Sequence, residues 1–497
     1  MTLLKKDTNP YILKLVECAE SWKEKGILRN FRTLQYVTEQ NMSIESINEF
    51  QGKNQPSNDV NAYLYTLKSK NPVGLEGVGV GLYDAATYIA HGLNVLHEEK
   101  PEVRFASIKD FSDEKLFVIA AYGEDEAYTS TFKGIFKKLK AKLEATGESG
   151  YKLITNLNFD HGRNFIRECA SYNRLDQFLG TMSPAEQDSL LTWFVEGMSE
   201  KEVLEQGVAV ADVIASIDDE KILGTISASI GKRYKEAIGS GNKNMEVAYG
   251  LLGSLYASKI NSTDTFFSSL VGKYPIESVS KVSNKDLFNP NGTSVQRYFF
   301  YDDKESKHND GKASYAHFKS RYENNPNWHI NDYGTYIVIN SLKGEHVWLV
   351  ANKPEAEEQG GKDIDSLLGS GDMTVNIAVH RGHSYHLEST TEKLSKRTKV
   401  VIAGSCGGYR HMVDILNRSP QSQILSTKGE GTMDINDPML NTIADEIRLG
   451  HDLDWQELWE GFEERFKHDD RFYDYVPPHR NLSYMYVKAF KKMTTKN

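Results

Sequence analysis

The chain has 497 residues, 39% of them hydrophobic and 26% charged, which is typical of a globular protein with enough apolar side chains for more than one core. Its formal net charge of −10 argues against a dedicated nucleic-acid-binding protein. The three cysteines, Cys18, Cys169 and Cys406, are odd in number and far apart, which argues against a disulfide framework. No apolar run reaches the length of a membrane span, so we expect no transmembrane segment. From the net charge we expect no nucleic-acid partner.

The first residues, MTLLKKDTNPYIL, lack the long apolar core and the small-residue cleavage site of a secretory signal peptide. We therefore expect no signal peptide in this chain. The sequence assigns neither a compartment nor an oligomeric state.

Residues 1–285 predict a mainly helical region that is open to division into subdomains. Tyr11–Lys25 repeats apolar residues at helical spacing, and Tyr128–Leu143 has an aromatic and leucine face opposite a lysine face. Further on, Ser183 and Glu186 flank a proline in the pattern of a helix-capping box. This region offers three alternative roles, as a scaffold, a partner-binding surface or an inhibitory cover.

A polar, turn-rich segment at 280–294 suggests a domain boundary near Asp286. Beyond it, residues 286–497 alternate β-branched apolar runs with helix-compatible segments, which predicts an α/β domain whose mostly parallel sheet has helices on both faces. The expected strands are Val295–Tyr301, Tyr333–Asn340, His346–Ala351, Val375–Val379, Lys399–Ala403 and Ser422–Thr427. The expected helices are Ala313–Tyr322, Tyr409–Leu416 and Pro438–Leu449, followed by an aromatic-rich tail.

Two of these strands end in residues with reactive side chains. Val375–Val379 leads into His383, and Lys399–Ala403 leads into Cys406. The segment Glu388–Lys396 between them is long enough for a right-handed crossover, so the strands can be parallel neighbours. Side chains at the carboxyl ends of such strands share one edge of the sheet. A thiol beside an imidazole is an activated nucleophile, and the sequence therefore predicts a His383/Cys406 dyad.

Glycines beside both side chains suggest an oxyanion site. Gly407 lets the backbone turn sharply after the thiol, so that its N–H, with backbone near Gly382, can face a developing negative charge. A second His-Gly pair at His161 precedes Cys169, but that segment predicts one helix, which separates the two side chains by more than two turns. Cys406 is therefore the preferred nucleophile.

These motifs resemble the caspase–gingipain–clostripain group of cysteine peptidases (clan CD) over residues 290–450. Gly382-His383 matches the Gly-His of the family and Cys406-Gly407 its Cys-Gly. The chain departs from the family at Ser384, where glycine is usual, and at Gly404, where an acidic residue is frequent. The resemblance implies a caspase-like fold and a hydrolase that cleaves peptide or protein substrates without a cofactor.

Four further residues are candidates for substrate binding on this resemblance. Asp302 and Asp303 end the first strand of the domain, where the specificity pocket of the family forms, and a carboxylate there favours a basic side chain before the scissile bond. Their alternative role is to cap the loop. Lys428 and Glu430 lie in the loop after strand Ser422–Thr427 and imply opposite charge preferences.

Two metal sites are alternatives to the dyad. His380, His383 and His386 recur at intervals of three with Cys406 elsewhere, and these are ligand types that zinc accepts. The acidic loop from Asp302 to Asp310 offers oxygen ligands for Ca²⁺. Neither set has the spacing of a known metal motif, so we expect no metal.

A second hypothesis comes from a different functional class. The chain could be a catalytically inactive, peptidase-like protein that keeps the fold as a binding or scaffold module. The two hypotheses differ in whether Cys406 is an activated thiol.

Overall fold

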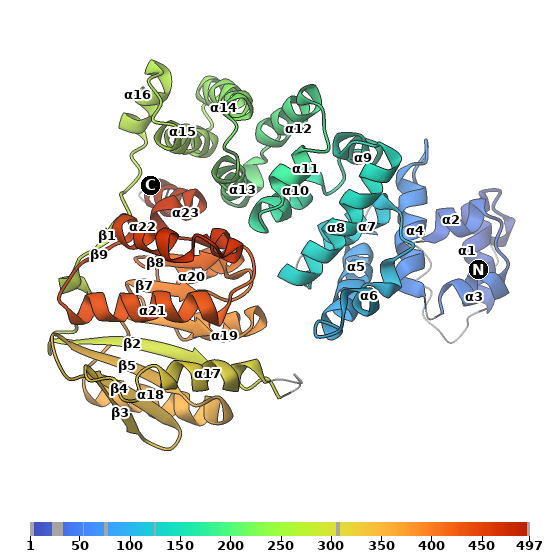
Figure 1. Cartoon of the computed structure of the whole chain (residues 1–497). Coiled ribbons are helices and arrows are strands. Elements are labelled where there is room, and N and C mark those ends of the chain that lie inside the picture. Colours follow the sequence, from blue (N-terminus) through green and yellow to red (C-terminus); the bar gives the residue numbers. More distant parts are fainter. Residues whose placement is uncertain are drawn as a thin grey trace. The chain divides into compact units, whose positions relative to one another are not determined.

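The structure is a computed structural model that describes residues 4–21, 33–52, 54–73, 78–123, 126–304 and 309–494 (Figure 1). The chain divides into two compact units. The first comprises Met1–Cys169 and Arg174–Leu190, and the second comprises Ala170–Asn173 and Leu191–Asn497. The change from helices to alternating strands and helices falls near Asp286, while the division between the units falls at Leu191.

The regular elements in the described part of the first unit are helices. Its α-helices are α1 (Pro10–Ser21), α2 (Leu34–Glu39), α3 (Ile44–Phe50), α4 (Gln55–Leu67), α5 (Val78–Val95), α6 (Pro101–Arg104), α7 (Asp113–Tyr122), α8 (Thr129–Thr146), α9 (Gly150–Asn156), α10 (Gly162–Ser171), α11 (Leu175–Leu179) and α12 (Pro184–Glu196), the last of which continues into the second unit. The amphipathic helix predicted at 128–143 is α8, with Phe132 and Leu139 buried. The predicted capping box is confirmed, since the Glu186 carboxylate accepts from the backbone N–H of Ser183 at 2.8 Å.

An eight-stranded sheet forms the centre of the second unit. Its strands are β2 (Thr293–Phe300), β3 (Trp328–Asp332), β4 (Tyr336–Ser341), β5 (His346–Asn352), β6 (Ile377–Arg381), β7 (Val400–Ala403), β8 (Gln423–Thr427) and β10 (Tyr475–Val476), in the order β10-β8-β7-β6-β2-β5-β4-β3. The five strands from β8 to β5 are parallel, and β10, β4 and β3 are antiparallel to their neighbours. The predicted mostly parallel sheet is confirmed; β3 and β10 were not expected.

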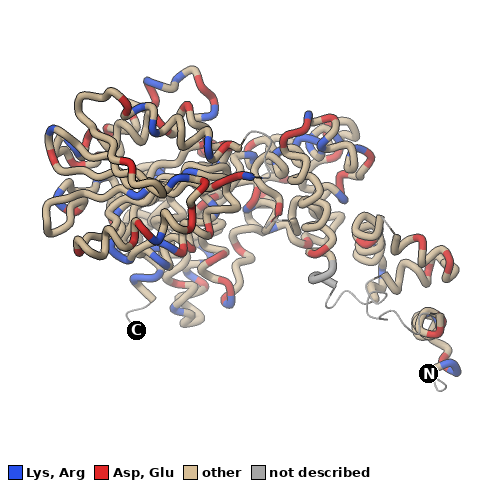
Figure 2. The backbone as a smooth tube through the Cα atoms, turned by 90° about the horizontal axis from the view of Figure 1, so that it is seen from below, with Lys and Arg blue, Asp and Glu red and all other residues tan. Residues whose placement is uncertain are grey.

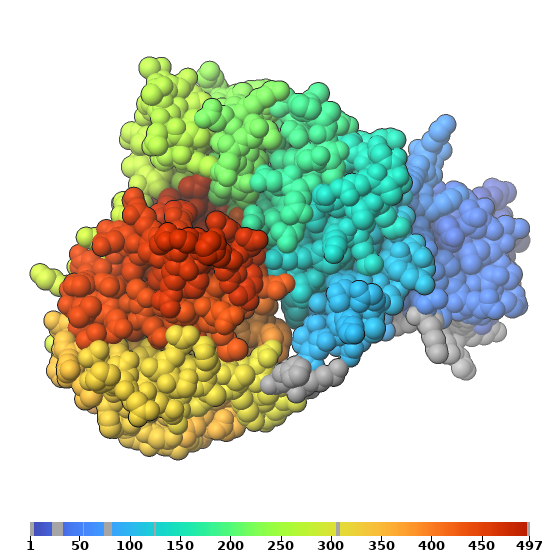
Figure 3. All heavy atoms as spheres, in the orientation of Figure 1, coloured from blue at the N-terminus to red at the C-terminus, as the bar shows by residue number. Residues whose placement is uncertain are grey.

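Helices cover both faces of this sheet, as predicted. One face packs against α17 (Asp310–Ser320), α21 (Met433–Arg448) and α22 (Trp455–Phe466), and the space-filling view shows their side chains meeting (Figures 1 and 3). The other face packs against α18 (Glu357–Ser370), α19 (Leu387–Glu392), α20 (Met412–Arg418) and α23 (Leu482–Thr494). A small second sheet pairs β1 (Lys281–Val282) with β9 (Leu453–Asp454).

Four helices that precede the sheet belong to the same unit. They are α13 (Val203–Ser216), α14 (Glu220–Ser240), α15 (Lys243–Lys259) and α16 (Thr265–Lys273). Both α13 and α15 pack on α23, the last helix of the chain (Figure 1). The approach is close, because a Cβ atom at Gly207 would lie 2.0 Å from the Tyr486 hydroxyl oxygen. Packing against the C-terminal helix therefore joins these helices to the α/β part of the chain.

Charged residues of both signs are interspersed along the backbone (Figure 2). Within the described residues, none of the helices combines the length and the apolar character that crossing a bilayer requires.

A buried carboxylate joins α15 to the C-terminal end of α16. Glu246, with 6% of its area exposed, accepts from Lys243 at 2.7 Å, Lys273 at 2.9 Å and Tyr274 at 3.0 Å. Hydrogen bonds from Lys243 and Lys273, with one from Tyr274, lower the pKa of Glu246 to about 2. Because this pKa lies below the ordinary value of 4.5, the cluster stabilises the fold fully above pH 4.5 and less as the pH falls toward 2.

Replacing Glu246 by glutamine should lower the free energy of unfolding at pH 7 by about 1.5 kcal/mol, since a charge-assisted set of hydrogen bonds is lost. The loss of thermal stability below pH 4.5 should also become shallower than in the wild type. Thermal unfolding across this pH range measures both effects. Glu236→Gln is the matched control, because Glu236 is half exposed in its pair with Arg233. Equal behaviour of the two variants would contradict the assignment.

Candidate active site

His383 and Cys406 follow the carboxyl ends of neighbouring parallel strands. Val379 of β6 lies opposite Ile402 of β7 in the parallel register. His383 follows Val379 by four positions, and Cys406 follows Ile402 by four positions. Because adjacent strands lie about 5 Å apart, both turns begin side by side at one edge of the sheet.

Cys406 differs from the other cysteines in its exposure. Its side chain is partly exposed, whereas Cys18 and Cys169 have 0% of their area exposed. Burial raises the pKa of the Cys18 and Cys169 thiols, so neither readily forms a thiolate. Of the three thiols, Cys406 is the one that solvent can reach.

The turn that carries His383 is held on one face of the sheet by His380. The Nε2–H of this buried ring donates to the carbonyls of Gly382 and His383, both at 3.1 Å. Nδ1 therefore accepts from the Thr390 hydroxyl at 2.7 Å, whose oxygen accepts in turn from Tyr301 at 2.6 Å. Burial lowers the pKa of His380 to about 3, so the ring stays neutral in this tautomer.

On the opposite face, Arg381 anchors the same turn. Its guanidinium donates to Ser314 at 2.8 Å and pairs with the buried Asp437 at 2.6 Å. Asp437 lies near the start of α21 and also contacts His317 of α17. The two residues before Gly382 thus fix the backbone of the turn from both sides of the sheet.

Asp303 faces the imidazole groups and does not line an open pocket. Its side chain has 0% exposure and accepts from Tyr385 at 2.9 Å and His386 at 3.1 Å, while one oxygen lies 3.8 Å from Nε2 of His383. Burial raises the pKa of Asp303, but hydrogen bonds from His386 and Tyr385 and the charge of His383 outweigh it, so the pKa is lowered. Asp303 thus faces His383, and its role in binding a basic substrate side chain stays a prediction.

Asp302 lies in the loop after β2 and serves the alternative role that the sequence allowed. It accepts from the Asn309 side chain at 2.7 Å, and the ammonium groups of Lys312 and Lys304 lie at 3.6 and 3.7 Å. The hydrogen bond from Asn309, with these cations, lowers the pKa of Asp302. With 7% of its side chain exposed, Asp302 secures the loop, and its substrate contact stays a prediction.

The expected oxyanion donor Gly407 is engaged elsewhere. Its N–H donates to the carbonyl of Gly429 at 2.9 Å, so its oxyanion role stays a prediction that requires this bond to break. Gly407 has φ +65°, a value that favours glycine. Gly382, the other expected contributor, packs so closely that a Cβ atom would lie 2.7 Å from the Tyr301 ring.

The departure from the family pattern at Gly404 has a steric reason. The Asn436 amide donates to the Gly404 carbonyl at 2.9 Å. A Cβ atom at Gly404 would lie 2.2 Å from the Asn436 side-chain oxygen, so a larger residue at 404 requires Asn436 to move.

Lys428 and Glu430 differ in where their charges lie. Lys428 is buried, and its ammonium group donates to three oxygens, those of Asp212 at 2.9 Å, Ala170 at 3.1 Å and Ser216 at 3.1 Å. Since an ammonium group has three N–H donors, all the donors of Lys428 are used within the chain, and its substrate contact stays a prediction. Glu430 is exposed and remains a candidate for substrate binding.

Among the residues that the structure describes, no group of three His, Cys, Asp or Glu side chains could hold a metal ion. The geometry therefore supports neither the zinc nor the calcium alternative. Both ring nitrogens of His380 are hydrogen-bonded, which removes it from a zinc site. Part of the proposed calcium loop, residues 305–308, lies outside the described residues.

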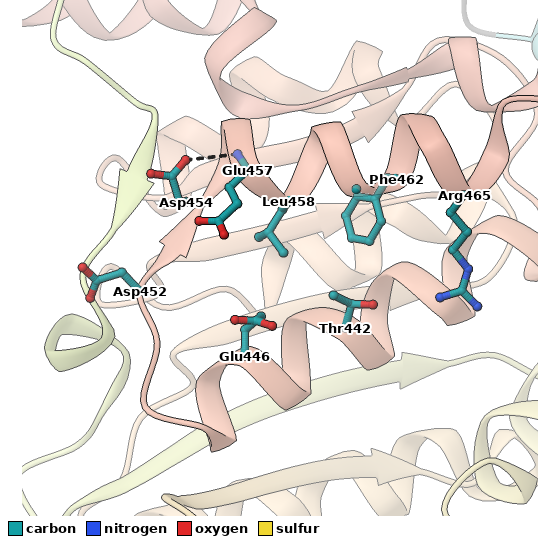
Figure 4. A pocket seen from close by; sticks show the side chains of 9 residues that line it. Thr442, Glu446, Asp452, Asp454, Glu457, Leu458, Phe462 and Arg465 are labelled. Carbon is teal, nitrogen blue, oxygen red and sulfur yellow. Dashed lines mark hydrogen bonds between the residues drawn. The ribbon is translucent and has the colours of Figure 1, made fainter.

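A cavity of about 290 Å³ lies between α21 and α22, away from the dyad (Figure 4). Glu446 lines it, ten residues along α21 from Asn436, or about 15 Å. Its carboxylates have structural partners: Glu446 pairs with His451, Asp452 accepts from the backbone of residue 284, and Asp454 caps α22. This cavity is therefore not part of the site.

Comparisons of the chain with models of protein families, with curated proteins and with solved structures find no match. The assignment of a chemistry therefore depends on the side chains and on the strand order. Sequence reasoning missed Asp437 and Asp212, because no local pattern links a helix carboxylate to a distant loop. It could have found His386 as a partner of Asp303, since both lie beside the predicted dyad strands.

Replacing His380 by phenylalanine keeps a ring but removes all three hydrogen bonds of the imidazole. In the wild type, His380 should lower the free energy of unfolding by about 2 kcal/mol between pH 8 and pH 5. The reason is that His380 binds a proton below pH 6.5 in the unfolded chain but only below about pH 3 in the folded protein. This part of the acid sensitivity should be absent in His380→Phe, as measured by denaturant unfolding at both pH values. His346→Phe, at an exposed histidine, should retain it; retention in both variants would refute a neutral His380.

Proposed function

We propose that the chain is a cysteine peptidase that cleaves peptide bonds through a His383/Cys406 dyad. The observation that carries the proposal is the parallel pairing of β6 with β7, which gives His383 and Cys406 equivalent positions at one edge of the sheet. The partial exposure of Cys406, against the full burial of the other two thiols, also supports it.

The carboxylates around His383 favour one tautomer. Nε2 lies 3.5 Å from Asp310 and 3.8 Å from Asp303, so a proton on Nε2 is electrostatically stabilised. Nδ1 then carries the lone pair and acts as the base. Asp303 orients the ring from a buried position, with its own geometry set by Tyr385 and His386.

The proposed reaction is acyl transfer. Nδ1 of His383 takes the thiol proton of Cys406, and the sulfur attacks the peptide carbonyl carbon. The imidazolium then returns the proton to the leaving amine as the carbon–nitrogen bond breaks, and water hydrolyses the thioester in a second acyl transfer. Backbone near Gly382 is the remaining candidate for oxyanion stabilisation, because the Gly407 N–H is bound to Gly429.

Among the four residues expected to bind substrate, Glu430 alone presents its charge to solvent. A carboxylate at this edge favours a basic side chain in the substrate. We therefore propose cleavage after basic residues, with Glu430 in place of Asp302 and Asp303 as the recognising group.

Labelling with peptide electrophiles that carry basic, acidic or neutral side chains tests the dyad. Cys406 should react selectively, basic peptides should react fastest, and His383→Ala should abolish the selectivity. Cys406→Ala should lower peptide hydrolysis by about 10³-fold or more, since the nucleophile is lost. Mass spectrometry at each cysteine gives the site of labelling.

Cys169→Ala is the matched control and should leave labelling of Cys406 unchanged. Slow labelling at Cys406, with no dependence on His383, would overturn the peptidase proposal in favour of a binding module. Selective labelling without preference for basic peptides, or a preference that survives Glu430→Gln, would overturn only the specificity.

Asp303→Asn should lower kcat about 10- to 100-fold with little change in KM, since the variant keeps its shape but no longer stabilises the proton on Nε2. The acid limb of the pH–rate profile should move as well. Steady-state kinetics on a peptide found in the labelling series measure both. Asp332→Asn, at a partly exposed carboxylate paired with Lys353, is the control; a changed KM with constant kcat would instead favour a substrate contact.

A further inference from the structure

Two loops flank the proposed nucleophile. One begins at Gly404 after β7, and the other begins at Lys428 after β8. They are joined directly, because the Thr427 hydroxyl donates to the Ser405 carbonyl and the Gly407 N–H donates to Gly429 at 2.9 Å. These hydrogen bonds hold the two loops at a constant distance from each other. They do not hold the two loops in place relative to the helices of the unit.

A third element, helix α13, holds both loops through one carboxylate. Oδ1 of Asp212 accepts from the Tyr409 hydroxyl at 2.6 Å and from the Lys428 ammonium at 2.9 Å. Tyr409 lies three residues after Cys406, so the contact is next to the nucleophile in the chain. Asp212 therefore bridges the loop of Cys406 and the loop after β8.

The bridge is almost fully buried. Asp212 and Tyr409 each have 2% of their area exposed, and Lys428 has 8%. Burial and the nearby charge of Asp212 raise the pKa of Tyr409 well above its ordinary value, so its hydroxyl remains a donor. The ammonium of Lys428 also lies 4.6 Å from the centre of the Tyr409 ring. In such a site the loss of one partner leaves a buried polar group without a hydrogen bond, which costs free energy. The positions of Asp212, Tyr409 and Lys428 are therefore tightly constrained.

Residues 170–173 complete the arrangement. The Ala170 carbonyl accepts from Lys428 at 3.1 Å, and the Ser171 hydroxyl lies 3.4 Å from Asp212. The Tyr172 hydroxyl accepts from Arg410 at 2.9 Å, four residues after Cys406. The nucleophile loop is thus fastened by chain segments far before the sheet in sequence.

We infer that Asp212 is a positioning residue for Cys406, acting through Tyr409 and Lys428, and that α13 is part of the proposed catalytic apparatus. The inference rests on the proposed peptidase function. Asp212 touches neither substrate nor the reacting atoms; it sets the backbone of residues 405–409, and so the direction of the thiol. A displacement of about 1 Å in such a group is enough to slow catalysis by about 100-fold.

Two variants of the full chain test this role. Tyr409→Phe removes one hydroxyl and keeps the ring, and Asp212→Asn removes the charge and keeps the shape. Each should lower the maximal inactivation rate constant of Cys406 with the best peptide electrophile about tenfold or more, with an unchanged inactivator-binding constant, because orientation and not binding is lost. The double variant should lose no more than the worse single variant, since both act through one bridge.

Glu246→Gln is the control for stability, because Glu246 is a buried ion-paired carboxylate of the same unit that contacts neither loop. Glu205→Gln is the control for charge on α13, where Glu205 is exposed. Both controls should keep the inactivation rate of the wild type, whatever their melting temperatures. Labelling of the buried Cys169 in any variant reports opening of the first unit.

The outcomes separate the two proposals. An unreactive Cys406 in the wild type would end the peptidase proposal and this inference with it. A reactive wild type with unchanged rates in Tyr409→Phe and Asp212→Asn would end the inference alone. A fall in rate that Glu246→Gln reproduces at equal melting temperature would also overturn it, since general destabilisation would then explain the effect. If Asp212→Asn does not fold, Tyr409→Phe decides.

Discussion

The parallel pairing of β6 between β7 and β2 is the constraint on which the rest of the structure depends. These strands are buried on both faces, so their register is set by the packing of alternate side chains against two helical layers. That register gives the turns after the strands equivalent starting points. His383, Cys406 and Asp303 follow strands that end at the same edge of the sheet, because these strands are neighbours.

The side chains at this edge separate into two groups by burial. His380, Arg381 and Asp303 are buried and hydrogen-bonded or ion-paired, whereas His383 and Cys406 are partly exposed. Buried polar groups that are hydrogen-bonded or ion-paired cannot reorient cheaply, which gives the exposed pair a rigid support. Asp212 supports the loop of Cys406 in the same way, through buried hydrogen bonds. Its helix, α13, lies in the part of the sequence that was expected to form the separate helical region.

Much of the fold could be predicted because the strands carry short, β-branched apolar runs bounded by turns. The parallel strands, their order of appearance and the helices α17, α20 and α21 follow from that pattern, as does the capping box at Ser183, whereas α18 between β5 and β6 was not expected. The division of the chain could not be predicted. Residues 203–273 have the pattern of an independent helical array, and only the packing of α13 and α15 on α23 joins them to the sheet unit.

The sequence by itself determined that His383 and Cys406 follow two buried strands, because strand pattern and residue type are local properties. The tertiary structure decided what the neighbouring charges do. From the sequence, Asp303 and Lys428 were expected at the exposed edge of the sheet. Both are buried instead, Asp303 with His386 and Lys428 with Asp212, and each partner is far away along the chain. Burial and partnership depend on which distant segments pack together, and this is fixed only when the whole unit folds.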